Sequence, residues 1–212
     1  MPEPAKKKDA EAKVPAMKVP PITGEALNKL MDDYSGPFNP DLKLEDLSQK
    51  ALIKLCKTYS LVALMLHWGW RQCVNEKYGE KVEYDMWKEN WLRVGQPYCE
   101  RMAHAFKIRD MNVIGFFKEL QLDPFFPMYR FEYTMEIINP NHGIMTVTRC
   151  PALLRWEPTG DTKFIQLVCS DLEKVCFEKS GQYFHPNLKF NALKIPPRKS
   201  PDEICCKWEV TC

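Results

Sequence analysis

The first half of the chain, from residue 44 to about residue 121, carries apolar residues at helical spacing. The clearest apolar stripe advances in steps of 4, 3, 4 and 7 residues and consists of Leu55, Tyr59, Val62, Leu66 and Cys73. This spacing predicts a long helix that packs one face against the rest of the protein. We expect the helix to end at Gly79, because glycine is favoured just beyond a helix C-terminus.

A second helix is predicted directly after Gly79. Its apolar positions step by 3, 4 and 3 residues and are Tyr84, Trp87, Trp91 and Val94. We expect Gly95 and Pro97 to break it, because both residues disfavour a helix interior. Two further helical pieces follow, one with Tyr98, Met102 and Ala105 on a face and the next with Val113, Phe117 and Leu120.

The period of the apolar residues changes to two after Pro124. Phe131, Tyr133, Met135 and Ile137 alternate with polar residues, which predicts a strand with one buried face. A turn sequence at 139–143 and a second strand at 144–150 complete a hairpin. A helix over about 162–179 and two strands at 188–194 and 204–211 follow.

These elements predict an α+β fold made of a single domain over residues 44–212. Its helical half covers 44–121, and its second half, 127–212, is an antiparallel sheet of sequence order ββαββ covered by helix. Residues 1–43 hold seven of the 17 prolines and few large apolar residues, so we expect an arm with one helical turn near 25–31. The arm is either a solvated or packed tail or a contact for a protein partner.

Charge and hydropathy exclude two classes of partner. The 30 Lys and Arg residues nearly balance the 28 Asp and Glu residues, so no basic stripe indicates nucleic-acid binding. The longest uncharged run, 58–70, has thirteen residues, whereas a membrane-spanning helix needs about 20. No apolar run follows the lysines near the N-terminus, so we expect a cytoplasmic protein without a membrane partner.

The nine cysteines are the main candidates for chemistry, since the usual nucleotide, hydrolase and zinc-protease motifs are missing. Cys169 and Cys176 are seven residues apart and so roughly 10 Å apart along a helix, too far to share one zinc ion. Cys206 shares its strand phase with Trp208, which predicts that Cys206 points inward and Cys205 outward.

A site built from Cys150, Cys169 and Cys206 is therefore geometrically possible, with thiols from a strand end, a helix and a strand. Three interpretations stay open. The thiols could fill space in the core, ligate a metal ion such as zinc or iron, or act as nucleophiles or redox groups.

The spacing of several C-terminal residues resembles the L-2-amino-thiazoline-4-carboxylate hydrolase-like family and its uncharacterised relatives, which are frequent in anaerobic bacteria and archaea. The resemblance covers about residues 45–212. It rests on Cys150-Pro151, Cys169, Asp171, Pro186, Pro196-Pro197 and Cys206-Lys207-Trp208, together with Trp68, Trp70, Tyr78-Gly79 and Trp87. Many relatives carry cysteine just before the Pro-Pro step, where this chain has Leu193-Lys194-Ile195.

The resemblance implies hydrolysis of a C–N bond in a small cyclic amidine acid. In that reaction Cys150, Cys169 and Cys206 would act as thiolates and Asp171 as the acid or base. His185 would shuttle a proton or else cap a strand, and Arg149 would bind a carboxylate or else oppose a strand acid.

The tryptophans near His67 also allow two interpretations. Trp68, Trp70, Trp87 and Trp91 could line a ligand groove, or they could form a helical core around a satisfied histidine. We therefore expect a cytoplasmic accessory protein that binds a metal ion or small ligand through its thiols. The alternative is a small hydrolase acting on a cyclic amidine or amide.

Overall fold

The computed structural model describes residues 30–126 and 130–212, and the chain divides into two compact units, 1–52 and 53–212. In the described part of the first unit, Met31 forms an isolated parallel bridge with Leu47. The expected N-terminal arm lies largely outside the described residues, as does the helical turn expected near 25–31 except for its last two residues.

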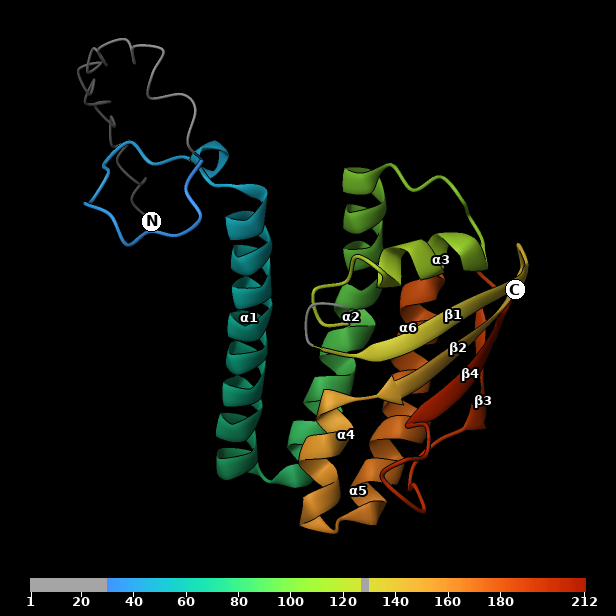
Figure 1. Ribbon diagram of the computed structural model, residues 1–212. Coiled ribbons are helices and arrows are strands. Elements are labelled where there is room, and N and C mark those ends of the chain that lie inside the picture. Colours follow the sequence, from blue (N-terminus) through green and yellow to red (C-terminus); the bar gives the residue numbers. More distant parts are fainter. Residues whose placement is uncertain (1–29, 127–129) are drawn as a thin grey trace, which may run out of the picture. The chain divides into compact units, whose positions relative to one another are not determined.

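The second unit has an α+β fold (Figure 1). Its elements are α1 (Gln49–Tyr78, which begins in the first unit), α2 (Glu80–Phe106), α3 (Val113–Leu120), β1 (Glu132–Asn139), β2 (His142–Arg149), α4 (Pro151–Trp156), α5 (Thr162–Leu167), α6 (Glu173–Gly181), β3 (Lys189–Lys194) and β4 (Cys206–Thr211). A π-helical turn, Val168–Leu172, joins α5 to α6. None of the helices in the described ranges combines the length and apolar character needed to cross a membrane.

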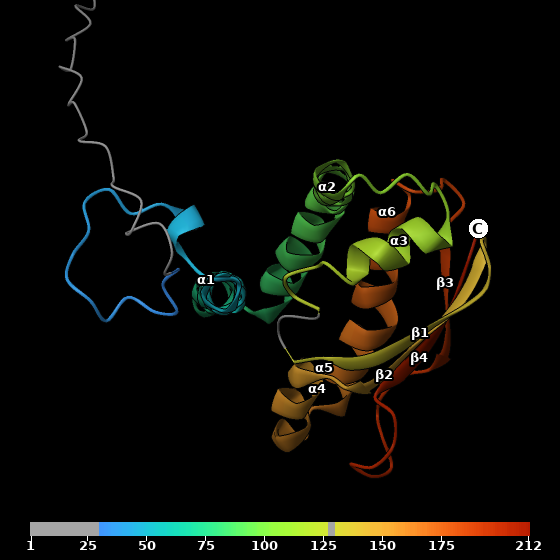
Figure 2. The same cartoon turned by 45° about the horizontal axis from the view of Figure 1, so that its top comes forward.

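The four strands form one antiparallel sheet in the order β1-β2-β4-β3. Three helices, α4, α5 and α6, separate the first two strands from the last two, where the sequence pattern predicted a single helix. Helices α3 and α6 lie on the same face of the sheet (Figure 2). That face is apolar because strand alternation turns Met145, Val147, Phe190, Trp208 and Val210 toward the helices.

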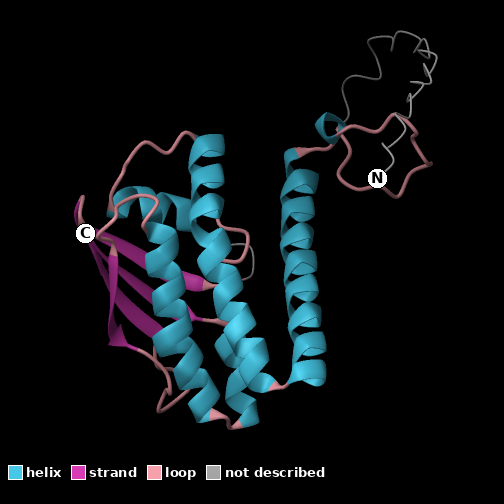
Figure 3. Cartoon of the chain, turned by 180° about the vertical axis from the view of Figure 1, so that it is seen from behind, coloured by secondary structure: helices cyan, strands magenta, loops and turns pink. Residues whose placement is uncertain are grey.

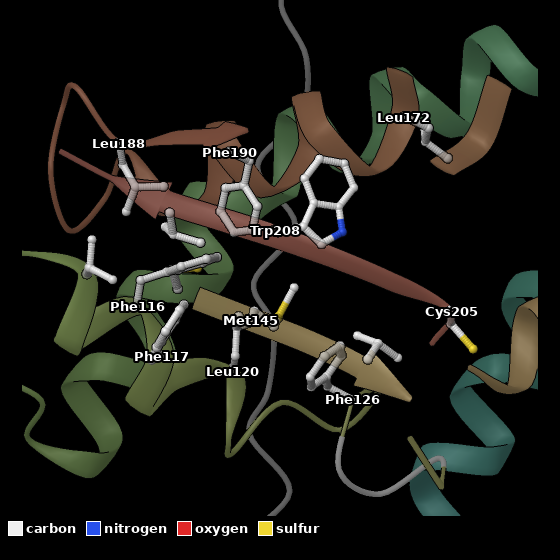
Figure 4. Packing of buried hydrophobic residues seen from close by; sticks show 14 of the residues in the cluster. Phe116, Phe117, Leu120, Phe126, Met145, Leu172, Leu188, Phe190, Cys205 and Trp208 are labelled. Atoms are coloured by element: carbon white, nitrogen blue, oxygen red, sulfur yellow. The ribbon is translucent and has the colours of Figure 1, made fainter. Parts of the chain in front are cut away.

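The core between α3 and the sheet consists of interlocking aromatic rings (Figure 4). Phe116 of α3 meets Phe190 of β3 edge to face, with ring centres 5.6 Å apart. Phe190 in turn contacts Trp208 of β4 at 5.9 Å. These three side chains are almost completely buried, so this contact fixes α3 against the middle of the sheet.

Helix α2 runs unbroken through Gly95 and Pro97, so the predicted end of the second helix was wrong. The two helices α2 and α6 lie side by side (Figure 3). A Cβ added at Gly95 would lie 2.3 Å from Oγ of Ser180 on α6. Gly95 therefore permits a close contact between two helices and does not end one.

Helix α1 ends at Tyr78 as predicted, and Gly79, with φ of 87°, connects it to α2. The predicted orientation of its apolar stripe was wrong, however. Tyr59 and Leu66 are 62% and 70% exposed, and Cys73 is also exposed. The buried side of α1 instead carries polar residues, among them Ser60 and Arg71.

These buried polar groups explain the orientation because each has a partner in the rest of the second unit. Arg71 forms an ion pair with the buried Glu83 of α2, and its guanidinium lies over the ring of Trp87, 3.3 Å from the ring centre. The Ser60 hydroxyl donates to the carbonyl oxygen of Pro124. Buried charges require such pairing, so these contacts outweigh the apolar stripe.

Candidate functional site

A cavity of about 220 Å³ lies in the second unit, between the helices and the sheet. Its walls come from α1, α2, α3, β2, α4, the α5–α6 segment and β4. Most of the lining is aromatic or aliphatic, with rings from residues such as Trp68, Trp87, Trp91, Phe116 and Trp208. A largely apolar cavity with a few polar groups is typical of a small-molecule site.

All three cysteines singled out from the sequence line this cavity. Cys150 is the residue before α4, and its sulfur accepts a hydrogen bond from the Leu153 amide at 3.4 Å. Cys169 lies in the π-helical turn, and Cys206 begins β4 in phase with Trp208, as predicted. The end of β2, the π-helical turn and β4 thus bring Cys150, Cys169 and Cys206 to one cavity, as predicted.

Burial keeps these thiols protonated. It raises the pKa of Cys150 and Cys206 to about 12 and raises that of Cys169 above its ordinary range. A negative charge on Cys150 would raise the pKa of both Cys169 and Cys206, and one on Cys206 would raise the pKa of Cys169. At neutral pH the trio therefore presents S–H groups to the cavity, and it lacks the thiolate that a nucleophile requires.

Cys205 was expected to point outward, but it is only 1% exposed. It precedes the first residue of β4, and its amide donates to the Val147 carbonyl oxygen at 2.8 Å. Its thiol donates to the Thr148 carbonyl oxygen at 3.3 Å. Strand alternation places the Cys205 side chain opposite that of Cys206 but does not make it exposed, because its amide and its thiol both bond to the end of β2.

Glu173 is the carboxyl group nearest in sequence to Cys169 that lines the cavity. It follows the π-helical turn directly, and such turns are frequent at functional sites. Burial raises the pKa of Glu173 to about 7. A carboxyl group that titrates near neutral pH can both donate and accept a proton.

A second polar group in the cavity lining consists of Tyr98, Cys99, Glu119 and Asp123. Burial raises the pKa of Glu119 to about 8, and the nearby Asp123 carboxylate adds to the shift. Burial also raises the pKa of Asp123 to about 6, although the nearby Tyr98 hydroxyl and the hydrogen bond from the Phe125 amide oppose this. Both acids therefore hold a proton more strongly than ordinary surface carboxyl groups.

Several polar atoms around the cavity have no protein partner. Within the described residues, the buried side-chain atoms without a hydrogen bond are Nη1 of Arg71, Nε1 of Trp87, the hydroxyl of Tyr98 and Oε1 of Glu119. Trp87, Tyr98 and Glu119 all line the cavity. Because an unpaired buried polar group costs about 1–3 kcal/mol, these three atoms indicate space for a hydrogen-bonding molecule.

His67 lies among the tryptophans, as the sequence suggested. Its ring centre is 6.2, 6.0 and 6.1 Å from those of Trp68, Trp87 and Trp91. Burial, aided by the Arg71 charge, lowers the pKa of His67 to about 4, so the ring is neutral at pH 7. These four residues line the cavity, whereas Trp70 is 39% exposed and does not.

Three predicted site residues, Asp171, His185 and Arg149, lie outside the cavity lining. Asp171 accepts hydrogen bonds from Tyr84 at 2.8 Å and Lys88 at 2.6 Å, and the bond from Lys88 contributes most to lowering its pKa. The Nδ1 atom of His185 accepts from the Asn187 amide at 3.3 Å. Arg149 pairs across the hairpin with Glu132, at 4.0 Å.

A metal ion fits this arrangement poorly. No three His, Cys, Asp or Glu side chains within 30–126 and 130–212 are arranged to hold one. The thiols would also have to lose protons that burial makes difficult to remove. The three thiols therefore do not fit the expected zinc or iron ion.

Sequence reasoning missed Glu119, Asp123 and Glu173, although two of them leave a signal. Glu119 lies on the apolar face of α3, three residues after Phe116, where a charged residue is unexpected. Glu173 lies four residues after Cys169 and therefore on the same face of its helix. An acidic residue at the spacing of buried residues is the sequence pattern that indicates Glu119 and Glu173.

Comparisons of the chain with protein-family models, with curated proteins and with solved structures found no match.

Proposed function

We propose that the protein binds a small, mostly apolar molecule that carries at least one hydrogen-bonding group, inside the thiol-lined cavity. The observation that carries this proposal is the combination of an aromatic cavity with unpaired polar atoms on Trp87, Tyr98 and Glu119. The size also supports it, since an apolar cavity of about 150 Å³ is enough to take benzene. A ligand of one ring with a polar substituent matches both features.

Phenol and toluene test the proposal because they have nearly the same shape and differ in one hydroxyl group. Titration calorimetry of the full chain should show phenol binding about tenfold more tightly than toluene, which corresponds to one satisfied buried polar group. Tyr98→Phe removes only an oxygen and should reduce this preference several-fold. If neither compound binds, or if toluene binds more tightly to both proteins, the proposal is wrong.

Hydrolysis of a cyclic amidine or amide is a second candidate, which the family resemblance implies and Glu173 favours. The Glu173 carboxylate would take a proton from water as the water oxygen attacks the amidine carbon. The resulting carboxylic acid would then give that proton to the departing nitrogen as the C–N bond breaks. The cavity thiols would stay protonated and act as hydrogen-bond donors.

This second candidate is tested by incubating the full chain with 2-amino-thiazoline-4-carboxylate and following loss of the substrate by chromatography. Turnover that disappears in Glu173→Gln and persists in Asp171→Asn would support it, because Asp171 lies outside the cavity lining. Equal rates with and without protein would contradict it.

A further inference from the structure

Two carboxyl groups lie close together in the lining of the cavity. Glu119 of α3 is only 1% exposed, and Asp123 follows four residues later, just beyond that helix. A negative charge on Asp123 raises the pKa of Glu119, as expected for neighbouring acids. No ion pair within the described part of the chain includes either residue, and Lys118, next to Glu119 in sequence, pairs with Asp110 instead. The two acids therefore lack the cation that usually accompanies carboxylates in a protein interior.

The oxygen atoms of this pair and of a nearby tyrosine are available to a ligand. Across residues 30–126 and 130–212, Oε1 of Glu119 and the hydroxyl of Tyr98 on α2 are among the buried atoms without a hydrogen bond. The Tyr98 hydroxyl also lies near Asp123, whose Oδ1 atom accepts from the Phe125 amide at 2.6 Å. Glu119, Asp123 and Tyr98 all line the cavity. Acceptors from three side chains match the three N–H donors of a primary ammonium group.

The charges of the cavity lining also favour a cation. Among the described residues, the lining contains three acids, Glu119, Asp123 and Glu173, and one exposed arginine, Arg155. His67 adds no charge at neutral pH, because burial lowers its pKa to about 4. An excess of acidic groups attracts a positive ligand and repels a negative one.

Aromatic rings adjoin the acid pair. Trp91 of α2 meets Phe125 edge to face, with ring centres 5.9 Å apart, and both residues line the cavity. Phe125 is also the residue whose amide donates to Asp123. An ammonium ion within about 6 Å of a ring centre is attracted by the negative face of the ring. Carboxylates and ring faces together therefore suit an organic ammonium ion.

We propose that the ligand of the cavity is a small primary amine with an aromatic ring, held by its ammonium group at Glu119, Asp123 and Tyr98. The inference rests on the proposed ligand-binding function and narrows the ligand to a cationic class. Benzylamine represents this class because it adds one aminomethyl group to benzene. The cavity of about 220 Å³ is larger than the about 150 Å³ that is enough for benzene alone.

Binding of the amine should release a proton from Glu119. Burial keeps this group protonated at neutral pH by raising its pKa to about 8, whereas a neighbouring ammonium ion favours the carboxylate. The groups around it keep their charge between pH 7 and pH 8.5. Asp123 is already ionised at pH 7, and burial keeps the Cys99 thiol and the hydroxyls of Tyr98 and Tyr133 protonated. The affinity for benzylamine should therefore rise about tenfold between pH 6.5 and pH 8.5.

Titration calorimetry of the full chain with benzylamine and benzyl alcohol tests the inference. The two compounds have nearly the same shape, but only benzylamine is positively charged near neutral pH, as lysine is. Benzylamine should bind at least about tenfold more tightly than benzyl alcohol at pH 8, because its hydrogen bonds are charge-assisted. Glu119→Gln keeps the shape of the side chain and removes its charge. It should abolish both this preference and the rise with pH, while the affinity for benzyl alcohol changes by less than about threefold. Asp123→Asn should also weaken benzylamine binding selectively.

Glu100→Gln is the matched control, since it removes the same charge from an exposed position of α2 outside the cavity lining. This variant should bind both compounds as the wild-type chain does. If benzyl alcohol binds and benzylamine binds no more tightly, the amine inference is wrong and the proposed function stands. If neither compound binds, both are wrong. Equal loss of benzylamine binding in Glu100→Gln and Glu119→Gln would also overturn the inference.

Discussion

Three carboxyl groups in the cavity lining, Asp123, Glu173 and Glu119, give the cavity an unusual response to pH. Burial raises their pKa values to about 6, 7 and 8. Each folded-state pKa is above the ordinary value for its group, so the folded protein binds protons more tightly than the unfolded chain. The resulting stabilisation is complete below about pH 4 and is lost as the pH rises through each folded pKa.

The wild-type protein should therefore lose stability between about pH 6 and pH 9, with a fall in Tm of more than about 5 °C. Glu119→Gln should flatten this dependence and be more stable than the wild-type chain near pH 9, because an amide has no proton to lose. Differential scanning calorimetry at several pH values measures the effect. Glu136→Gln, at an exposed position of β1, should follow the wild-type curve. A Glu119→Gln curve parallel to the wild-type curve would contradict the assignment.

The cysteines should differ in reactivity according to their burial. Cys56 and Cys73 are exposed on α1, whereas burial raises the pKa of the cavity thiols Cys150 and Cys206 to about 12. A thiol-specific reagent should therefore label Cys56 and Cys73 in a fast native phase. Mass spectrometry of the labelled peptides identifies the sites. Fast labelling of Cys206 in the double variant Cys56→Ser, Cys73→Ser would show that the cavity holds a thiolate.

At the scale of elements, the contact between α2 and α6 depends on Gly95. A methyl group at this position would overlap the Ser180 side chain, so Gly95→Ala should destabilise the protein by about 1–3 kcal/mol. Ser180→Gly in the same chain should restore much of the loss, because it removes the overlapping atoms. Denaturant unfolding measures both values.

The control for this effect is Gly69→Ala on α1. No atom lies within 4 Å of the added Cβ there, so the substitution should be neutral or should stabilise the helix by up to about 1 kcal/mol. If Gly95→Ala and Gly69→Ala have the same effect, the close contact between α2 and α6 is not what requires the glycine.

Periodicity predicted where most elements lie but not which side of α1 is buried. Local spacing and turn residues correctly predict the end of α1 before Gly79, the helix α3 and the first hairpin. The buried side of α1 depends on Arg71 meeting Glu83, a pairing between two helices that no local pattern reveals. The same applies to Gly95, whose role appears only when Ser180 of α6 lies beside it.

At the scale of the whole molecule, the cysteines of the candidate site could be predicted from the sequence, whereas its acidic residues were missed. Strand phase and helix spacing identified Cys206 and Cys169, and both line the cavity. Asp171 was expected through the family resemblance, yet it forms a half-exposed ion pair with Lys88. Glu119 and Glu173 are each in phase with buried residues in the sequence, but that they line one cavity becomes visible only when α3, α6 and the sheet enclose it.

The cavity also explains why this fold tolerates unpaired polar atoms in its interior. Trp87 and Glu119 are almost completely buried, and each leaves one polar atom without a partner. Stability alone would favour apolar residues at both positions. A ligand that bonds to these atoms accounts for the cost, and it would stabilise the folded protein in proportion to its concentration above Kd.

The most direct test is a crystal structure of the full chain soaked with phenol. The account predicts electron density for the phenol ring among Trp87, Trp91 and Phe116, with its oxygen within hydrogen-bonding distance of Tyr98, Glu119 or Nε1 of Trp87. Phenol bound only at the protein surface, or a cavity that side chains fill completely, would contradict the proposal that this space is a ligand site.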